Sequence, residues 1–200
     1  NIGRGNAFAA LYNLVLRTDL AFATAGITIG GQIAREVRIS NNTTEGMLQG
    51  IHVGVSHRVA DNVRDLAGAI TIANNNGTVV LPLYAGRWDR HGIFAGNCQS
   101  LVIENNNMQI RRQDAGNNVV AIDGIRVWGQ LGGRLMVTQN HLSSAVGNNR
   151  NSFTTGIHVN PVIQRSNLAQ WIIMWNVAPS VNFTVVATNG ALPLEGTNTP

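Results

Sequence analysis

Gly92-Ile93-Phe94-Ala95 and Gly124-Ile125-Arg126-Val127 are two copies of one tetrapeptide, in which a variable residue stands between an isoleucine and a small apolar residue. Further copies begin at Gly26, Gly50 and Gly156, so the steps between successive glycines are 24, 42, 32 and 32 residues. A repeat of this length indicates a stacked-repeat architecture. Because apolar residues alternate with one variable residue, the repeated element is predicted to be a β-strand whose variable side chain faces outward.

A second signal, a short apolar strand followed by an asparagine, alternates with the first. Its asparagines, which step by 33, 31, 34 and 36 residues, are Asn42, Asn75, Asn106, Asn140 and Asn176. Amides that repeat at the spacing of stacked parallel strands can hydrogen-bond along the stack, and a buried amide is otherwise costly. We therefore expect an asparagine ladder. Further β-rich runs such as Val79-Val80-Leu81 lie between the two signals, which predicts about five coils of three short strands.

This double pattern resembles that of right-handed parallel β-helix proteins, the pectate-lyase-like superfold, in which a turn asparagine stacks on its counterpart in the next coil. The resemblance covers residues 20–180 and implies an all-β, right-handed parallel β-helix solenoid. No specific enzyme family is matched, and this superfold hosts many functions. Residues 181–200 are interpreted as a C-terminal closing segment and tail.

Residues 1–19 are interpreted as an N-terminal cap or a first partial coil. The stretch 6–17 is rich in alanine and leucine, and an amphipathic helix there would cover the open end of the stack against edge pairing. We expect this capping helix. The alternative is a further strand at Leu14-Val15-Leu16, because Asp19 follows Leu16 at the same distance as Asn42 follows Ile39.

Composition excludes several classes of function. Only 12% of residues are charged, and all fourteen basic residues are arginines scattered along the chain, so we expect no nucleic-acid partner. No window is apolar enough to predict a membrane span. The single cysteine, Cys98, excludes an intrachain disulfide, and no cluster of ligands predicts a metal or a cofactor.

The outward positions of the repeat supply the candidate site. The variable residues Phe94, Arg126 and His158 should form one row, with Trp128 and Asn160 beside it. Loops at 82–91 and 109–118 should lie against one another next to this row. A tryptophan flanked by arginine and amides suits a sugar ring or a protein surface. The predicted ligand-binding patch contains Arg126, Trp128, His158, Asn160, Phe94, Trp88, Asp89 and Arg112.

The chemistry of β-helix polysaccharide enzymes is mostly missing. No close pair of aspartates suits glycoside hydrolysis, no carboxylate cluster suits calcium, and no lysine can act as a base. We therefore predict no catalytic residues and a non-catalytic extracellular or surface module, at the cell or virion surface. It would present a rigid face to a glycan or protein, or assemble as a homo-oligomer, filament or larger appendage. The alternative is a polysaccharide lyase or glycoside hydrolase with an unfamiliar site, centred on Arg126, His158, His91, Asp89 and Asp123.

Overall fold

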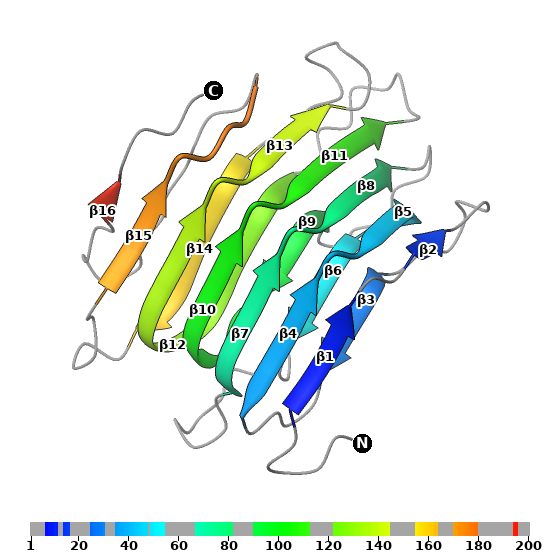
Figure 1. The fold of residues 1–200 in the computed structure, drawn as a ribbon. Helices are drawn as coiled ribbons and strands as arrows, with labels where there is room; N and C mark the ends of the chain where they lie inside the picture. Colours follow the sequence, from blue (N-terminus) through cyan, green and yellow to red (C-terminus); the bar gives the residue numbers. More distant parts are fainter. Residues whose placement is uncertain are drawn as a thin grey trace.

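The protein is a parallel β-helix. Its computed structural model describes residues 7–11, 14–16, 25–30, 35–47, 49–54, 67–81, 90–112, 122–144, 155–163, 170–179 and 194–195. The regular structure of these residues is entirely β-strand, without a helix, and their strand pairings are parallel (Figure 1). The predicted all-β class and solenoid architecture are confirmed.

The strands form three parallel stacks. Stack 1 contains β3 (Ala25–Gly30), β6 (Gln49–Gly54), β9 (Arg90–Ala95), the first part of β12 (Ile122–Thr138) and β14 (Thr155–Ile163). Stack 2 contains β1 (Ala7–Leu11), β4 (Glu36–Ser40), β7 (Ala67–Ala73), β10 (Cys98–Glu104), the second part of β12, β15 (Gln170–Met174) and β16 (Leu194–Glu195). Stack 3 contains β2 (Leu14–Leu16), β5 (Thr43–Met47), β8 (Asn76–Leu81), β11 (Asn107–Arg112) and β13 (His141–Ser144).

Each coil visits the three stacks in turn, as in β9, β10 and β11, which confirms three short strands per coil. Figure 1 shows stack 2 continuing into stack 3, with stack 1 behind them. The 17-residue strand β12 runs from stack 1 into stack 2 without a break and joins both into one 11-stranded sheet. In the last coil, stack 3 is represented by an isolated bridge between Val177 and His141.

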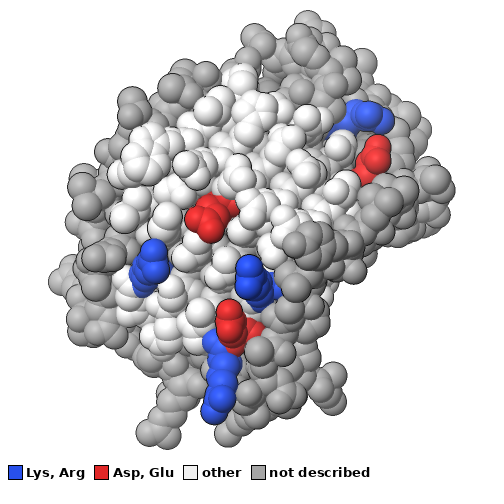
Figure 2. Space-filling model, in the orientation of Figure 1, with Lys and Arg blue, Asp and Glu red and all other residues white. Residues whose placement is uncertain are grey.

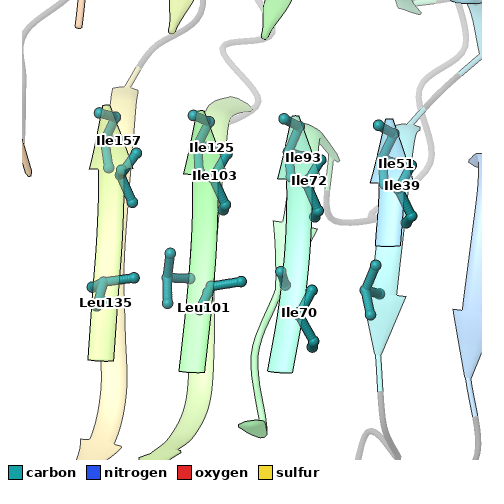
Figure 3. Packing of buried hydrophobic residues seen from close by; sticks show 14 of the residues in the cluster. Ile39, Ile51, Ile70, Ile72, Ile93, Leu101, Ile103, Ile125, Leu135 and Ile157 are labelled. Carbon is teal, nitrogen blue, oxygen red and sulfur yellow. The ribbon is translucent and has the colours of Figure 1, made fainter. Parts of the chain in front are cut away.

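The core is a set of apolar columns that follow the stacking. The isoleucines of the repeated tetrapeptide pair in register between coils, and Figure 3 shows them as one column opposite the apolar residues of stack 2. This column consists of Ile51, Ile93, Ile125 and Ile157, all fully buried. The repeated isoleucines therefore occupy equivalent positions of one continuous core, in which each coil buries its apolar face against the next.

The asparagine ladder lies at the turn between stacks 2 and 3. In each step, the side-chain Nδ2 of one asparagine donates to the Oδ1 of the next over 2.8–2.9 Å, and its backbone N–H donates to the same oxygen over 3.0 Å. The Nδ2 of Asn106 also donates to the carbonyl oxygen of Ile72 in the preceding coil. All five predicted residues take part, and each is 1% exposed. The ladder thus satisfies buried amides that would otherwise be costly.

The predicted N-terminal helix is wrong. Ala7–Leu11 is strand β1, which pairs with β4, and Leu14–Leu16 is strand β2, which pairs with β5. The alternative strand at Leu14–Leu16 is therefore present, but it belongs to stack 3: Leu16 pairs with Glu45, and the register partner of Ile39 is Ala10. The helix propensity of these residues does not decide their structure, because their backbone groups form hydrogen bonds with the edges of two neighbouring strands. At the other end, β16 lies within the predicted tail and pairs with β15.

Candidate functional site

The glycine that begins each tetrapeptide permits a close approach between coils of stack 1. A Cβ atom on Gly50 would lie 2.5 Å from the carbonyl oxygen of Gly92, and one on Gly92 would lie 2.6 Å from that of Gly124. Neither contact is tolerable, so the column requires glycine. A Cβ on Gly92 would also meet the buried side chain of Met108, so Gly92 and Ile93 both face the interior.

Two consecutive inward residues break the alternation of the strand. As a result, the residue before each glycine and the residue after each isoleucine meet on the outer side. The second of these positions forms the predicted outward row, whose members pair in register from coil to coil: His52, Phe94, Arg126 and His158. The first position brings His91 and Asp123, which pair with one another in register, into contact with that row.

Asp123, Arg126, Trp128 and His158 form a connected group that we call the Arg126 patch. The Oδ2 of Asp123 lies 3.7 Å from the Nε of Arg126 and 3.3 Å from the Nδ1 of His158. The Arg126 guanidinium lies over the Trp128 ring, 4.9 Å from its centroid. Asp123 is 5% exposed and Trp128 is 38% exposed, so a buried carboxylate holds two side chains beside an accessible indole.

Two histidines and a phenylalanine extend the patch along stack 1. The Nδ1 of His52 and the Nε2 of His91 are 3.2 Å apart and share a hydrogen bond. The rings of His52 and Phe94 are stacked, with centroids 4.5 Å apart and planes 6° from parallel. His91 is 1% exposed, and its Nδ1 has no hydrogen-bond partner in the part of the chain that the structure describes.

Burial holds the pKa of His91 well below its ordinary value of 6.5, and the neighbouring His52 and Arg126 lower this pKa further. Both effects disfavour a second positive charge on the ring. His91 is therefore neutral at neutral pH and contributes a hydrogen bond and packing to the site, without adding charge to the face.

The structure brings part of the predicted patch together. Phe94, Arg126 and His158 are register partners, and the backbone of Asn160 pairs with that of Trp128. Arg112 lies on β11 in stack 3, in a different sheet from Arg126. Trp88 and Asp89 lie outside the described residues. The ligand-binding role of all these residues stays a prediction.

Sequence reasoning placed Asp123 and His91 only in the alternative, enzymatic site. Simple alternation gives Asp123 the same orientation as the buried Ile125 and Val127, so its contact with Arg126 and His158 was not predicted. The signal that could have revealed it is the glycine at position 124, which changes the orientation of the residue before it.

The charged groups of the described residues form no single-sign field on the face drawn in Figure 2, where basic and acidic side chains are interspersed on a mostly uncharged surface. Among these same residues, no group of three or more histidine, cysteine or acidic side chains could hold a metal ion. No helix within the described ranges is long and apolar enough to cross a membrane. The chain matches no protein-family model, no curated protein and no solved structure.

Proposed function

We propose that this protein is an extracellular or surface β-helix module that binds a glycan on the outer side of stack 1, at the Arg126 patch. The observation that carries the proposal is the accessible Trp128 ring with the Arg126 guanidinium over it. An indole offers an apolar face to the C–H groups of a sugar ring, and a guanidinium offers several donors to its hydroxyls.

The surroundings of the patch favour recognition of a ligand by a rigid surface. Asp123 orients both Arg126 and His158, and Trp128 stands on a strand that is paired on both sides. Side chains held in this way lose little conformational freedom when a ligand binds, which favours affinity. In the three coils that precede the one with Trp128, the position that corresponds to Trp128 is a glycine. These glycines are Gly30, Gly54 and Gly96, so no side chain projects from those positions.

A glycan array followed by calorimetry on the strongest binders tests this proposal. Trp128→Ala and Arg126→Ala should each weaken binding by about tenfold or more. Arg38→Ala is the matched control, because Arg38 is an exposed arginine on stack 2 and should be neutral. The proposal is wrong if no glycan binds, or if binding survives both patch substitutions.

Catalysis on the bound polysaccharide is a second candidate, favoured by the contact between Asp123 and His158. Asp123 engages the Nδ1 of His158, which leaves the Nε2 of this ring to accept a proton. This is the geometry of a general base, although a second carboxylate for paired acid–base hydrolysis is absent from the described part of the patch.

Turnover assays separate the two candidates. Polysaccharides that bind are incubated with the protein, and new reducing ends and unsaturated products are measured. For a binding module, none should form. If turnover occurs and is abolished by Arg126→Ala or His158→Gln, the non-catalytic proposal is wrong and the catalytic one is correct.

A further inference from the structure

The residue before each ladder asparagine has a left-handed backbone conformation. The φ angle is 58° at Asn41, 58° at Asn74, 51° at Asn105, 57° at Gln139 and 57° at Trp175. This conformation makes the sharp turn between stacks 2 and 3, and it directs the side chain of this residue outward. All five residues are exposed.

Asparagine is the usual non-glycine residue in this conformation, and three of the five positions follow that rule. Trp175 departs from it. A bulky aromatic side chain at positive φ is strained, and the ring of Trp175 is 58% exposed, so burial does not compensate for the strain. An exposed, strained aromatic residue in a position that suits asparagine reduces stability, which points to a role in binding.

The neighbours of Trp175 in this column are uncharged. Gln139 precedes it by one coil, and the Nδ2 of Asn105 donates to the Oδ1 of Asn74 over 2.6 Å, so the exposed amides are ordered along the stack. Val177, two residues after Trp175, is 37% exposed. The column runs along the junction of stacks 2 and 3, on the face where Figure 2 shows few charges, of both signs.

We propose that Trp175 and the amide of Gln139 form a second binding site, for a neutral sugar ring of a polysaccharide. The indole supplies the stacking face, and the carboxamide supplies one donor group and one acceptor for hydroxyls. The absence of charged side chains from the five turn positions favours a neutral ligand over a charged one. The site lies at the turn between stacks 2 and 3, apart from stack 1, and is independent of the Arg126 patch.

Trp175→Asn tests this proposal because stability and binding should change in opposite directions. Asparagine relieves the backbone strain, so the melting temperature should rise by about 2–4 °C. Binding of neutral hexose and N-acetylhexosamine oligomers, measured by calorimetry in a Trp128→Ala background, should weaken by about tenfold or more. Trp175→Phe should retain part of the affinity, because it keeps an aromatic face.

Three outcomes would overturn the proposal. A lower melting temperature in Trp175→Asn would show that the indole stabilises the fold. Unchanged binding, or no binding in the Trp128→Ala background, would show that the column is not a saccharide site. Loss of a dimer in light scattering, without any effect on saccharide binding, would assign Trp175 to self-association. If Trp128→Ala by itself abolishes all saccharide binding, the second site at Trp175 is overturned, while the Arg126 patch is supported as the binding site.

Discussion

His91 shows how a single buried side chain links the site to pH. Its ring is enclosed beside His52 and Phe94, and its hydrogen bond to His52 requires one nitrogen to donate and the other to accept. Burial, His52 and Arg126 all lower its pKa in the folded protein. Protonation therefore opposes folding at this position.

The stability of the protein should consequently fall as the pH drops below about 6.5. Between that value and the lowered folded pKa of His91, the unfolded chain binds more protons than the folded chain, so the free energy of unfolding decreases. Denaturant titrations at a series of pH values measure this slope. His91→Gln should reduce it, whereas His141→Gln, which changes an exposed histidine on stack 3, should retain it. An unchanged slope in His91→Gln would contradict the prediction.

Cys98 should be unreactive in the folded protein. It is fully buried, and burial raises the pKa of its thiol to about 12. Because the thiolate is the reactive form, a disulfide exchange reagent at neutral pH should modify Cys98 only after unfolding. Modification measured against denaturant concentration should follow the unfolding curve. Rapid modification without denaturant would show that β10 opens locally.

At the scale of the strand, the glycine column determines both the packing of stack 1 and the position of its site. Gly92 allows two coils to approach and turns its preceding residue toward the outer row. The same glycine therefore serves stability and the assembly of the candidate site.

Gly92→Ala should destabilise the protein by about 3 kcal/mol or more, because its Cβ would contact a backbone carbonyl that cannot move without shifting a strand. Gly77 is the matched control on stack 3. A Cβ there would lie 2.5 Å from the sulfur of Met108 and 3.0 Å from the Oγ1 of Thr44, which are both side-chain atoms, so Gly77→Ala should cost less than Gly92→Ala. Denaturant titration gives both values, and similar losses for the two variants would refute the distinction.

At the scale of the whole molecule, the asparagine ladder connects every coil from Asn42 to Asn176. Asn106→Ala should cost about 3 kcal/mol or more, since it leaves the buried amide of Asn75 and the carbonyl of Ile72 without their partner. Hydrogen exchange should accelerate at the backbone amide of Asn75, which donates to Asn106. Asn76→Ala, at an exposed neighbouring position, should be nearly neutral. Equal effects from the two variants would argue against the ladder's contribution.

The periodicity of the sequence predicted the architecture because the repeated residues are core residues. Their spacing along the chain is enough to indicate a stack of similar coils. The N-terminal segment was mispredicted because its helix propensity competes with pairing to β4 and β5, and that pairing is non-local. The outward row followed from alternation, whereas Asp123 required knowing that Gly124 changes the direction of side chains. Trp175 is distinguished by the left-handed backbone conformation before each ladder asparagine, which the spacing of the asparagines does not specify.

The ladder also has a direction. Each asparagine donates to the one in the following coil, so Asn42 depends on Asn75, Asn75 on Asn106, and onward toward the C-terminus. During synthesis, which proceeds from the N-terminus, each coil emerges from the ribosome before the coil that carries its acceptor. Until the next coil arrives, the asparagine of the newest coil lacks the acceptor for its backbone N–H and for one of the hydrogen bonds of its Nδ2, as Asn106 would lack Asn140. The hydrogen bonds thus order the assembly of the stack in time, and a chain halted between two ladder asparagines would carry its least stable coil at the growing end.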